Sequence, residues 1–176
     1  MAKLTSWLLP VAFLAPFLAA NGAVAQTLPT NFQQTTALQG FVNPTMIRFA
    51  PDGRVFVSEK SGRIWIFDDL SDATPVSITA LQANVNNYWD RGLLGMVIDP
   101  NFPTDPYIYV LYAYDAPPTE NAPYWNDACA DPVGVGCLVT SRLSRLEIAA
   151  NSTLVGSEQV LIDREWCQQY PSHSSG

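Results

Sequence analysis

The chain has 176 residues, with 9 lysines and arginines against 16 aspartates and glutamates, so its formal net charge is −7. This acidic balance argues against binding to a nucleic-acid phosphate backbone or to an anionic membrane surface. Apolar residues make up 48% and charged residues only 14%, which excludes an intrinsically disordered chain. The 14 prolines and 10 glycines favour many turns over long helices.

The first 25 residues have the layout of a secretory signal peptide. Lys3 gives a positive start, residues 8–20 are almost entirely apolar, and Ala-Val-Ala at 23–25 forms a small-x-small cleavage pattern. We predict cleavage before Gln26 and a mature chain, residues 26–176, that is secreted or periplasmic. The alternative is an uncleaved N-terminal anchor, although the apolar stretch is short for a membrane span. No later segment reaches spanning length.

The three cysteines fit an oxidising compartment. Cys129 and Cys137 lie close together in a loop-like stretch and are natural disulfide partners there. Cys167 is then a free thiol, half of an intermolecular bridge, or the partner of a cysteine missing from this sequence, and we favour the last. One histidine and no Cys-x-x-Cys leave too few ligands for a zinc site. The sequon at Asn151 predicts a surface loop and a glycosylation site in a host that uses it.

The first half of the mature chain predicts short strands. The apolar run at 46–50 leads into Pro-Asp-Gly at 51–53, a strong hairpin signal, and a strand returns at 55–57. Two further strands are expected at 64–67 and 76–81. This makes four short strands joined by tight turns.

The pattern then recurs, with expected strands at 93–98, 107–114, 142–148 and 159–162. Phe-Ala-Pro-Asp at 49–52 corresponds to Ile-Asp-Pro-Asn at 98–101, an offset of 49 residues. A repeat of four strands predicts an all-β chain with the blades of a β-propeller; a β-sandwich is the alternative. The chain encodes about two blades plus the start of a third. Propellers close with about four to eight blades, so we expect a longer parent protein.

One long segment, residues 115–140, interrupts the strands. It contains several prolines, the two paired cysteines, Tyr124 and Trp125. Loops of this length are usually functional or disordered. The segment is either a surface insertion held by its disulfide or a wall of a substrate cleft, where Tyr124 and Trp125 stack on a sugar.

Several stretches carry a family resemblance, in collinear order from about residue 28 to the end. They are residues 43–64, with Phe-Ala-Pro-Asp-Gly-Arg-Val-Phe-Val at 49–57, and residues 91–102, with Arg-Gly-Leu-Leu-Gly-Met-Val-Ile-Asp-Pro-Asn-Phe. The strand at 107–110 and the segments 141–146 and 160–163 continue the match. The sequence resembles the glucose/sorbosone dehydrogenase family.

The resemblance implies a six-bladed propeller that binds pyrroloquinoline quinone and calcium and oxidises aldose sugars or related polyols outside the cytoplasm. Its partners are a sugar or polyol substrate and an electron acceptor. In this family a histidine in a His-x-x-Gly setting acts as general base, and His173 stands at that place, before Gly176. A neutral imidazole is a usable base near pH 7. Without the resemblance, the sequence would predict only that His173 lies in a surface loop.

Some positions depart from the family pattern. Asp90 and Arg91 replace a polar amide pair that contacts the substrate region, so they are candidate substrate contacts together with Trp125; a loop salt bridge is the alternative. Ser172 replaces an acidic neighbour of the base. Cofactor ligands are expected beyond residue 176. The carboxylates at 68, 69 and 72 lack the spacing of a calcium loop and predict a solvated turn, so we assign no metal ligand in this chain.

The sequence leaves three candidate functions open. The first is a quinone-dependent sugar dehydrogenase, active only in the full-length parent. The second is a non-catalytic extracellular propeller that binds carbohydrate or protein, since one fold hosts both kinds of function. The third is a hydrolytic propeller such as a lactonase, which needs a calcium ring of acidic and amide side chains that this half does not show.

Overall fold

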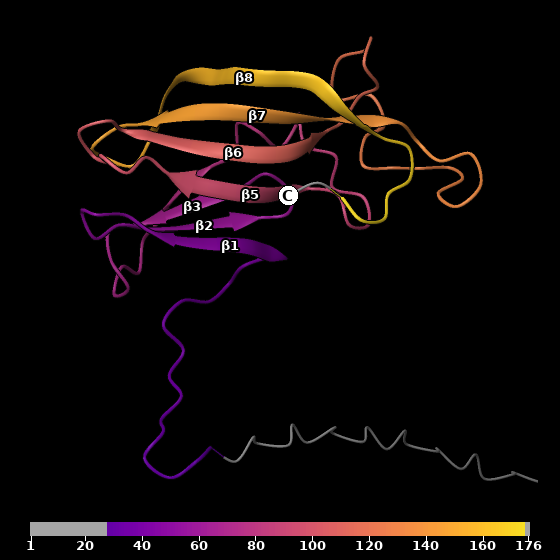
Figure 1. Ribbon diagram of the computed structural model, residues 1–176. Helices are drawn as coiled ribbons and strands as arrows, with labels where there is room; N and C mark the ends of the chain where they lie inside the picture. The colour runs from indigo at the N-terminus through magenta and orange to yellow at the C-terminus, as the bar shows by residue number, and fades with distance from the viewer. Residues whose placement is uncertain (1–27, 175–176) are drawn as a thin grey trace, which may run out of the picture. The chain divides into compact units, whose positions relative to one another are not determined.

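The computed structural model describes residues 28–174, and these contain eight strands and no helix (Figure 1). The chain divides after Thr35, and all the strands lie in the second unit, which is compact. The first sheet has the order β1-β2-β3-β4, with strands β1 (Pro44–Phe49), β2 (Val55–Glu59), β3 (Ile64–Phe67) and β4 (Val76–Ile78). The second has the order β5-β6-β7-β8, with strands β5 (Leu93–Ile98), β6 (Tyr107–Tyr114), β7 (Val139–Ile148) and β8 (Leu154–Gln168).

Every neighbouring pair of strands is antiparallel, so each sheet is a four-stranded meander in chain order. This is the topology of a propeller blade. The eight strands that the sequence predicts are confirmed. The ends differ in places. β4 stops at Ile78 rather than at residue 81, and β8 extends on both sides of the predicted 159–162 to 15 residues. The predicted signal peptide, residues 1–25, lies outside the described residues.

The first turn of each sheet follows the same scheme. Gly53 has φ 97° and donates its N–H to Ala50 O at 3.0 Å, which closes the Pro-Asp-Gly turn between β1 and β2. In the second sheet Phe102 N donates to Asp99 O at 3.0 Å, and the Phe102 side chain turns inward with 2% of its surface exposed. A glycine or a short polar residue supplies the unusual backbone or the local acceptor that such turns need.

Apolar side chains from both sheets form one core. Phe56 and Ile66 contribute from the first sheet, and Ile108 and Leu146 from the second. Phe56 meets Phe102 edge to face, with ring centroids 5.7 Å apart. Because side chains alternate along a strand, the other face of the first sheet carries a separate apolar cluster of Val55, Val57, Phe67, Leu38, Phe41 and Trp65. Both faces of this sheet are therefore apolar, as expected for a blade between two neighbours.

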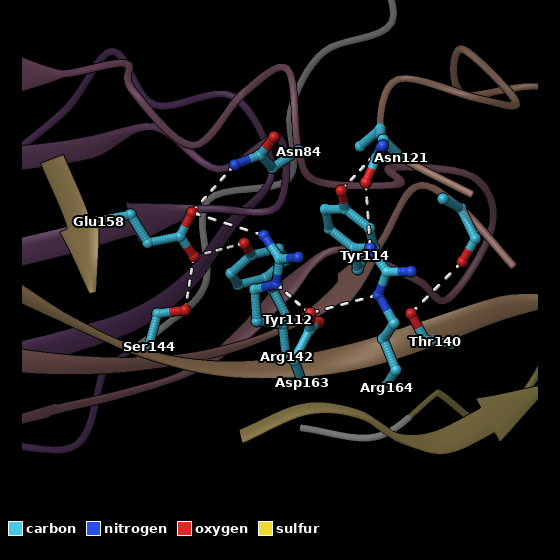
Figure 2. A network of polar contacts seen from close by, with 12 residues as sticks. Asn84, Tyr112, Tyr114, Asn121, Thr140, Arg142, Ser144, Glu158, Asp163 and Arg164 are labelled. Carbon is cyan, nitrogen blue, oxygen red and sulfur yellow. Dashed lines mark hydrogen bonds and ion pairs between the residues drawn. The ribbon is translucent and has the colours of Figure 1, made fainter. Parts of the chain in front are cut away.

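A partly buried polar network holds β8 against the rest of the second sheet (Figure 2). The Glu158 carboxylate accepts hydrogen bonds from the Tyr112 and Ser144 hydroxyls and, at 2.9 Å, from Asn84 Nδ2. Arg142 lies 3.8 Å from Glu158 and donates to Asp163 at 3.0 Å. Burial and the neighbouring Glu158 raise the pKa of Tyr112, so the phenol stays a donor. The longest strand is thus held by side chains as well as by its backbone ladder.

Candidate functional site

The loop between the two sheets contacts the segment that follows β8. Asp90 N donates to Pro171 O at 3.1 Å. The Asp90 carboxylate accepts the backbone N–H of His173 at 3.0 Å, across 83 residues of sequence. Two of the residues that the sequence singled out, the candidate base and a candidate substrate contact, therefore lie side by side.

His173 has an unusual backbone and an exposed side chain. Its φ is 57°, in the left-handed region that residues with a Cβ seldom adopt. The Gln168 side chain holds the residues on either side: its Nε2 donates to Ser172 O at 3.0 Å, and its Oε1 accepts the Ser174 hydroxyl at 3.1 Å. The main chain of the turn is fixed while the imidazole is left open to solvent.

Arg91 is buried, with 0% of its surface exposed. Its guanidinium donates to Cys137 O at 2.8 Å, to Cys137 Sγ at 3.2 Å and to Gln168 O at 3.0 Å, and makes no salt bridge with Asp90. Burial lowers the pKa of Arg91 to about 10, and the nearby Asp115 opposes the shift. These contacts give Arg91 a structural role, and they lend no support to the predicted contact with substrate.

Lys60 reaches the same loop from the end of the first sheet. Its Nζ donates to Asn87 O at 2.6 Å and to Asn87 Oδ1 at 2.8 Å. Burial lowers the pKa of Lys60, while Asp127 and Asp90 act in the opposite direction. Gly92 lies against this side chain: a Cβ there would stand 2.5 Å from Lys60 Cγ, and the φ of 150° also favours glycine. The glycine of the Arg-Gly-Leu-Leu-Gly stretch thus makes room for the lysine.

The long segment after β6 begins at Asp115, whose carboxylate organises it. That carboxylate accepts from Asn86 Nδ2 at 2.5 Å, Tyr124 N at 3.1 Å and Asn126 N at 2.9 Å. Burial raises the pKa of Asp115, and these hydrogen bonds oppose the rise. The sequence analysis missed this residue. The available signal was a lone carboxylate directly after a buried strand, in a position where it can fold a loop back on itself.

The predicted substrate contact Trp125 is half-buried in this segment. Its Nε1 donates to Leu138 O at 2.8 Å, and its ring meets Tyr124 edge to face at 4.9 Å between centroids. Tyr124 is 46% exposed. The aromatic pair is therefore anchored in the loop, and only part of its surface is free. Stacking of Trp125 on a sugar stays a prediction.

The other sequence predictions on this chain have mixed outcomes. The disulfide between Cys129 and Cys137 is confirmed. Cys167 is exposed and unpaired in the described part of the chain. Asn151 lies in an exposed turn and accepts the Thr153 hydroxyl at 2.7 Å; its glycosylation stays a prediction.

A metal ion or a quinone needs charged or polar side chains that are free to bind it. Within residues 28–174, no three His, Cys, Asp or Glu side chains gather as they do around a metal ion. The carboxylates of Asp69 and Asp72 accept hydrogen bonds from their own turn, chiefly from Ser71 and Thr74, and these bonds lower the pKa of both groups. Lys60 and Arg91 already hold Asn87, Cys137 and Gln168. We therefore assign no quinone or calcium ligand among these residues.

One protein-family model matches part of the sequence. The family model for "Glucose / Sorbosone dehydrogenase" matches residues 41–124. Over these residues the chain is similar to the glucose/sorbosone dehydrogenase family. The match includes Lys60, Asp90 and Arg91, whereas His173 and the disulfide lie outside it. No curated protein matches significantly. In the described residues, no helix is long and apolar enough to cross a membrane.

Solved structures confirm the fold class. The chain is similar to the PQQ-bound form of aldose sugar dehydrogenase from Streptomyces coelicolor, with 15% identity and a TM-score of 0.51 over 72% of this chain and 31% of that one. It is also similar to a structure described as glucose dehydrogenase, with 17% identity and a TM-score of 0.52 over 72% of this chain and 33% of that one. The two four-stranded sheets are accordingly two blades of a propeller, and the chain spans about a third of the length of these structures.

Proposed function

We propose that this chain is the N-terminal part of an exported, quinone-dependent oxidoreductase that oxidises an aldose sugar or a related polyol. The family match over residues 41–124 and the likeness to a PQQ-bound aldose sugar dehydrogenase support this class. The observation that carries the proposal is the contact between Asp90 and His173. This hydrogen bond joins His173, the candidate base, to the loop of Asp90, which lies within the residues that the family model matches.

His173 supplies the base. Oxidation of a sugar carbinol to a carbonyl removes two electrons with the carbon-bound hydrogen, as hydride, and one proton from the hydroxyl. The neutral imidazole takes that proton, and the exposed His173 side chain is open to a sugar. Pyrroloquinoline quinone, bound with calcium by later blades, supplies the acceptor for the hydride. Asp90 and Trp125 are the candidate substrate contacts. A separate electron acceptor would reoxidise the cofactor.

Exchange of His173 tests the proposal. The complete protein is reconstituted with pyrroloquinoline quinone and calcium and assayed with a panel of aldoses and polyols and a dye acceptor. We expect His173→Ala to lower kcat about 10²- to 10⁴-fold, the usual range for a lost general base. The exposed Tyr170→Phe is the control and keeps its activity. Full activity of His173→Ala would remove the proposed base.

The same assay distinguishes the other function. No dye reduction by the wild-type protein with any sugar, together with calorimetric binding of a sugar, identifies a non-catalytic binding propeller. Export is tested separately, by N-terminal sequencing of the protein recovered outside the cytoplasm. Cleavage before Gln26 is expected, and a retained Met1 contradicts it.

A further inference from the structure

We infer that Asp90 and Gln168 are positioning residues, which hold the main chain around His173 so that its imidazole is presented in one place. The inference rests on the proposed function, because it gives a purpose to the base that the function requires. It also changes the role of Asp90 from a contact with the sugar to a support for the base.

The first support is the backbone of His173 itself. A φ of 57° is strained for a residue with a Cβ, so such a backbone persists where its surroundings hold it. The Asp90 carboxylate accepts the His173 N–H at 3.0 Å. A charged acceptor strengthens this hydrogen bond over a neutral one. Asp90 thus opposes relaxation of the turn at the residue that bears the strain.

The second support is the Gln168 amide, which brackets His173. Its donor and its acceptor bind Ser172 O and the Ser174 hydroxyl, at 3.0 and 3.1 Å. The two ends of one planar amide therefore fix the distance between the neighbours of the base. An amide can do this because it carries a donor and an acceptor, whereas a carboxylate lacks the donor and an amine lacks the acceptor.

The residue next to Asp90 holds the start of this turn. Arg91 donates to Gln168 O at 3.0 Å, and Asp90 N donates to Pro171 O at 3.1 Å. Consecutive residues of one loop thus hold both ends of the segment 168–173. This arrangement gives the Asp-Arg pair at positions 90 and 91 a role of its own, where the family pattern has a polar amide pair near the substrate.

The test compares Asp90→Ala with Asp90→Asn, whose amide oxygen still accepts the His173 N–H. The complete protein with quinone and calcium is assayed first. We expect Asp90→Ala to lower kcat about 10- to 100-fold, the effect of a displaced reacting group, with little change in KM. Asp90→Asn restores most of kcat. Asp72→Ala is the control, since its carboxylate also accepts backbone N–H groups, in a turn of the first sheet.

The second readout needs neither quinone nor sugar. Amide hydrogen exchange is followed in peptides that cover residues 168–174 of the unloaded complete protein. We expect faster exchange in Asp90→Ala and Gln168→Ala and the wild-type rate in Asp90→Asn. Unchanged exchange in Asp90→Ala overturns the inference, and so does a rise in KM with kcat unchanged, which identifies Asp90 as a substrate contact.

The two proposals fail separately. If the wild-type protein oxidises no sugar, the proposed function is wrong, and the exchange rates alone decide whether Asp90 and Gln168 hold the turn. If His173→Ala abolishes activity but Asp90→Ala leaves kcat and exchange unchanged, the function stands and the positioning role is wrong.

Discussion

Arg91 joins three parts of the second unit through one buried guanidinium. It extends from the loop between the sheets to the disulfide-closed segment at Cys137 and to the end of β8 at Gln168. We predict that Arg91→Ala lowers the free energy of unfolding by about 2–3 kcal/mol, because two buried carbonyl groups lose a charged donor. Urea unfolding of the complete protein measures this change. The exposed Arg48→Ala is the control, and an equal effect of the two substitutions contradicts the prediction.

The buried charge of Arg91 also predicts a dependence on pH. Its pKa is about 10 in the folded chain, below the ordinary value that arginine has in the unfolded chain, so between these two values the unfolded chain binds more protons. In this window the contribution of Arg91 to the free energy of unfolding rises with pH; below it the cost of burying the charge is present in full. We expect the stability difference between wild type and Arg91→Met to shift in favour of wild type from pH 9 to pH 11. A flat difference in urea unfolding rules this out.

At the scale of single elements, β8 depends on Glu158. The carboxylate binds two hydroxyls and the Asn84 amide, and it lies 3.8 Å from Arg142 (Figure 2). We predict that Glu158→Gln destabilises the protein by about 1–3 kcal/mol, because the new NH₂ group faces donors and Arg142 loses a partner. Urea unfolding and amide exchange of β8 measure the loss. Glu165→Gln, an exposed exchange on the same strand, is expected to have no effect; equal losses would falsify the assignment.

The strands show how far the sequence predicts the elements. Short apolar runs between turn residues such as Asp-Gly and Asp-Pro located all eight strands, since this local pattern is typical of strands that are buried on both faces. It missed most of β8, where Gly156, Ser157 and Glu158 carry no apolar alternation. The register of the β7–β8 pairing shifts across these residues, and Glu158 is held by the Tyr112 and Ser144 hydroxyls of other strands. Such long-range hydrogen bonds leave no local signature.

The sequence likewise predicts only part of the candidate site. Asp90 and His173 were identified from the sequence, but their contact was not, because 83 residues separate them. Arg91 was predicted to contact the substrate because it stands where the family has a polar amide. The sequence could not show that its guanidinium is buried and donates to Cys137 O and Gln168 O. Gln168 and Lys60 were missed. An amide or a lysine shows its role only when the fold brings its partners to it.

At the scale of the whole chain, apolar surface remains open on both blades. Beside the separate cluster on the first sheet lies a groove of about 530 Å³, lined in part by Leu38, Trp65 and Leu70. On β8 the exposed apolar side chains are Val155, Val160, Leu161 and Trp166. In a closed propeller each blade face packs against a neighbour. We propose that further blades of a longer parent protein cover these faces.

Residues 26–176 on their own are therefore expected to be poorly packed. Exposed patches of this kind promote association, and a meander with a long free edge such as β8 invites pairing with another chain. We predict that the isolated piece binds a hydrophobic fluorescent dye, self-associates in sedimentation experiments and melts over a broad range. The complete protein, measured in parallel, binds little dye and melts cooperatively, because its blade faces are covered. A monomeric isolated piece with a sharp melting transition and no dye binding shows that two blades suffice, and it removes the physical reason for a longer parent.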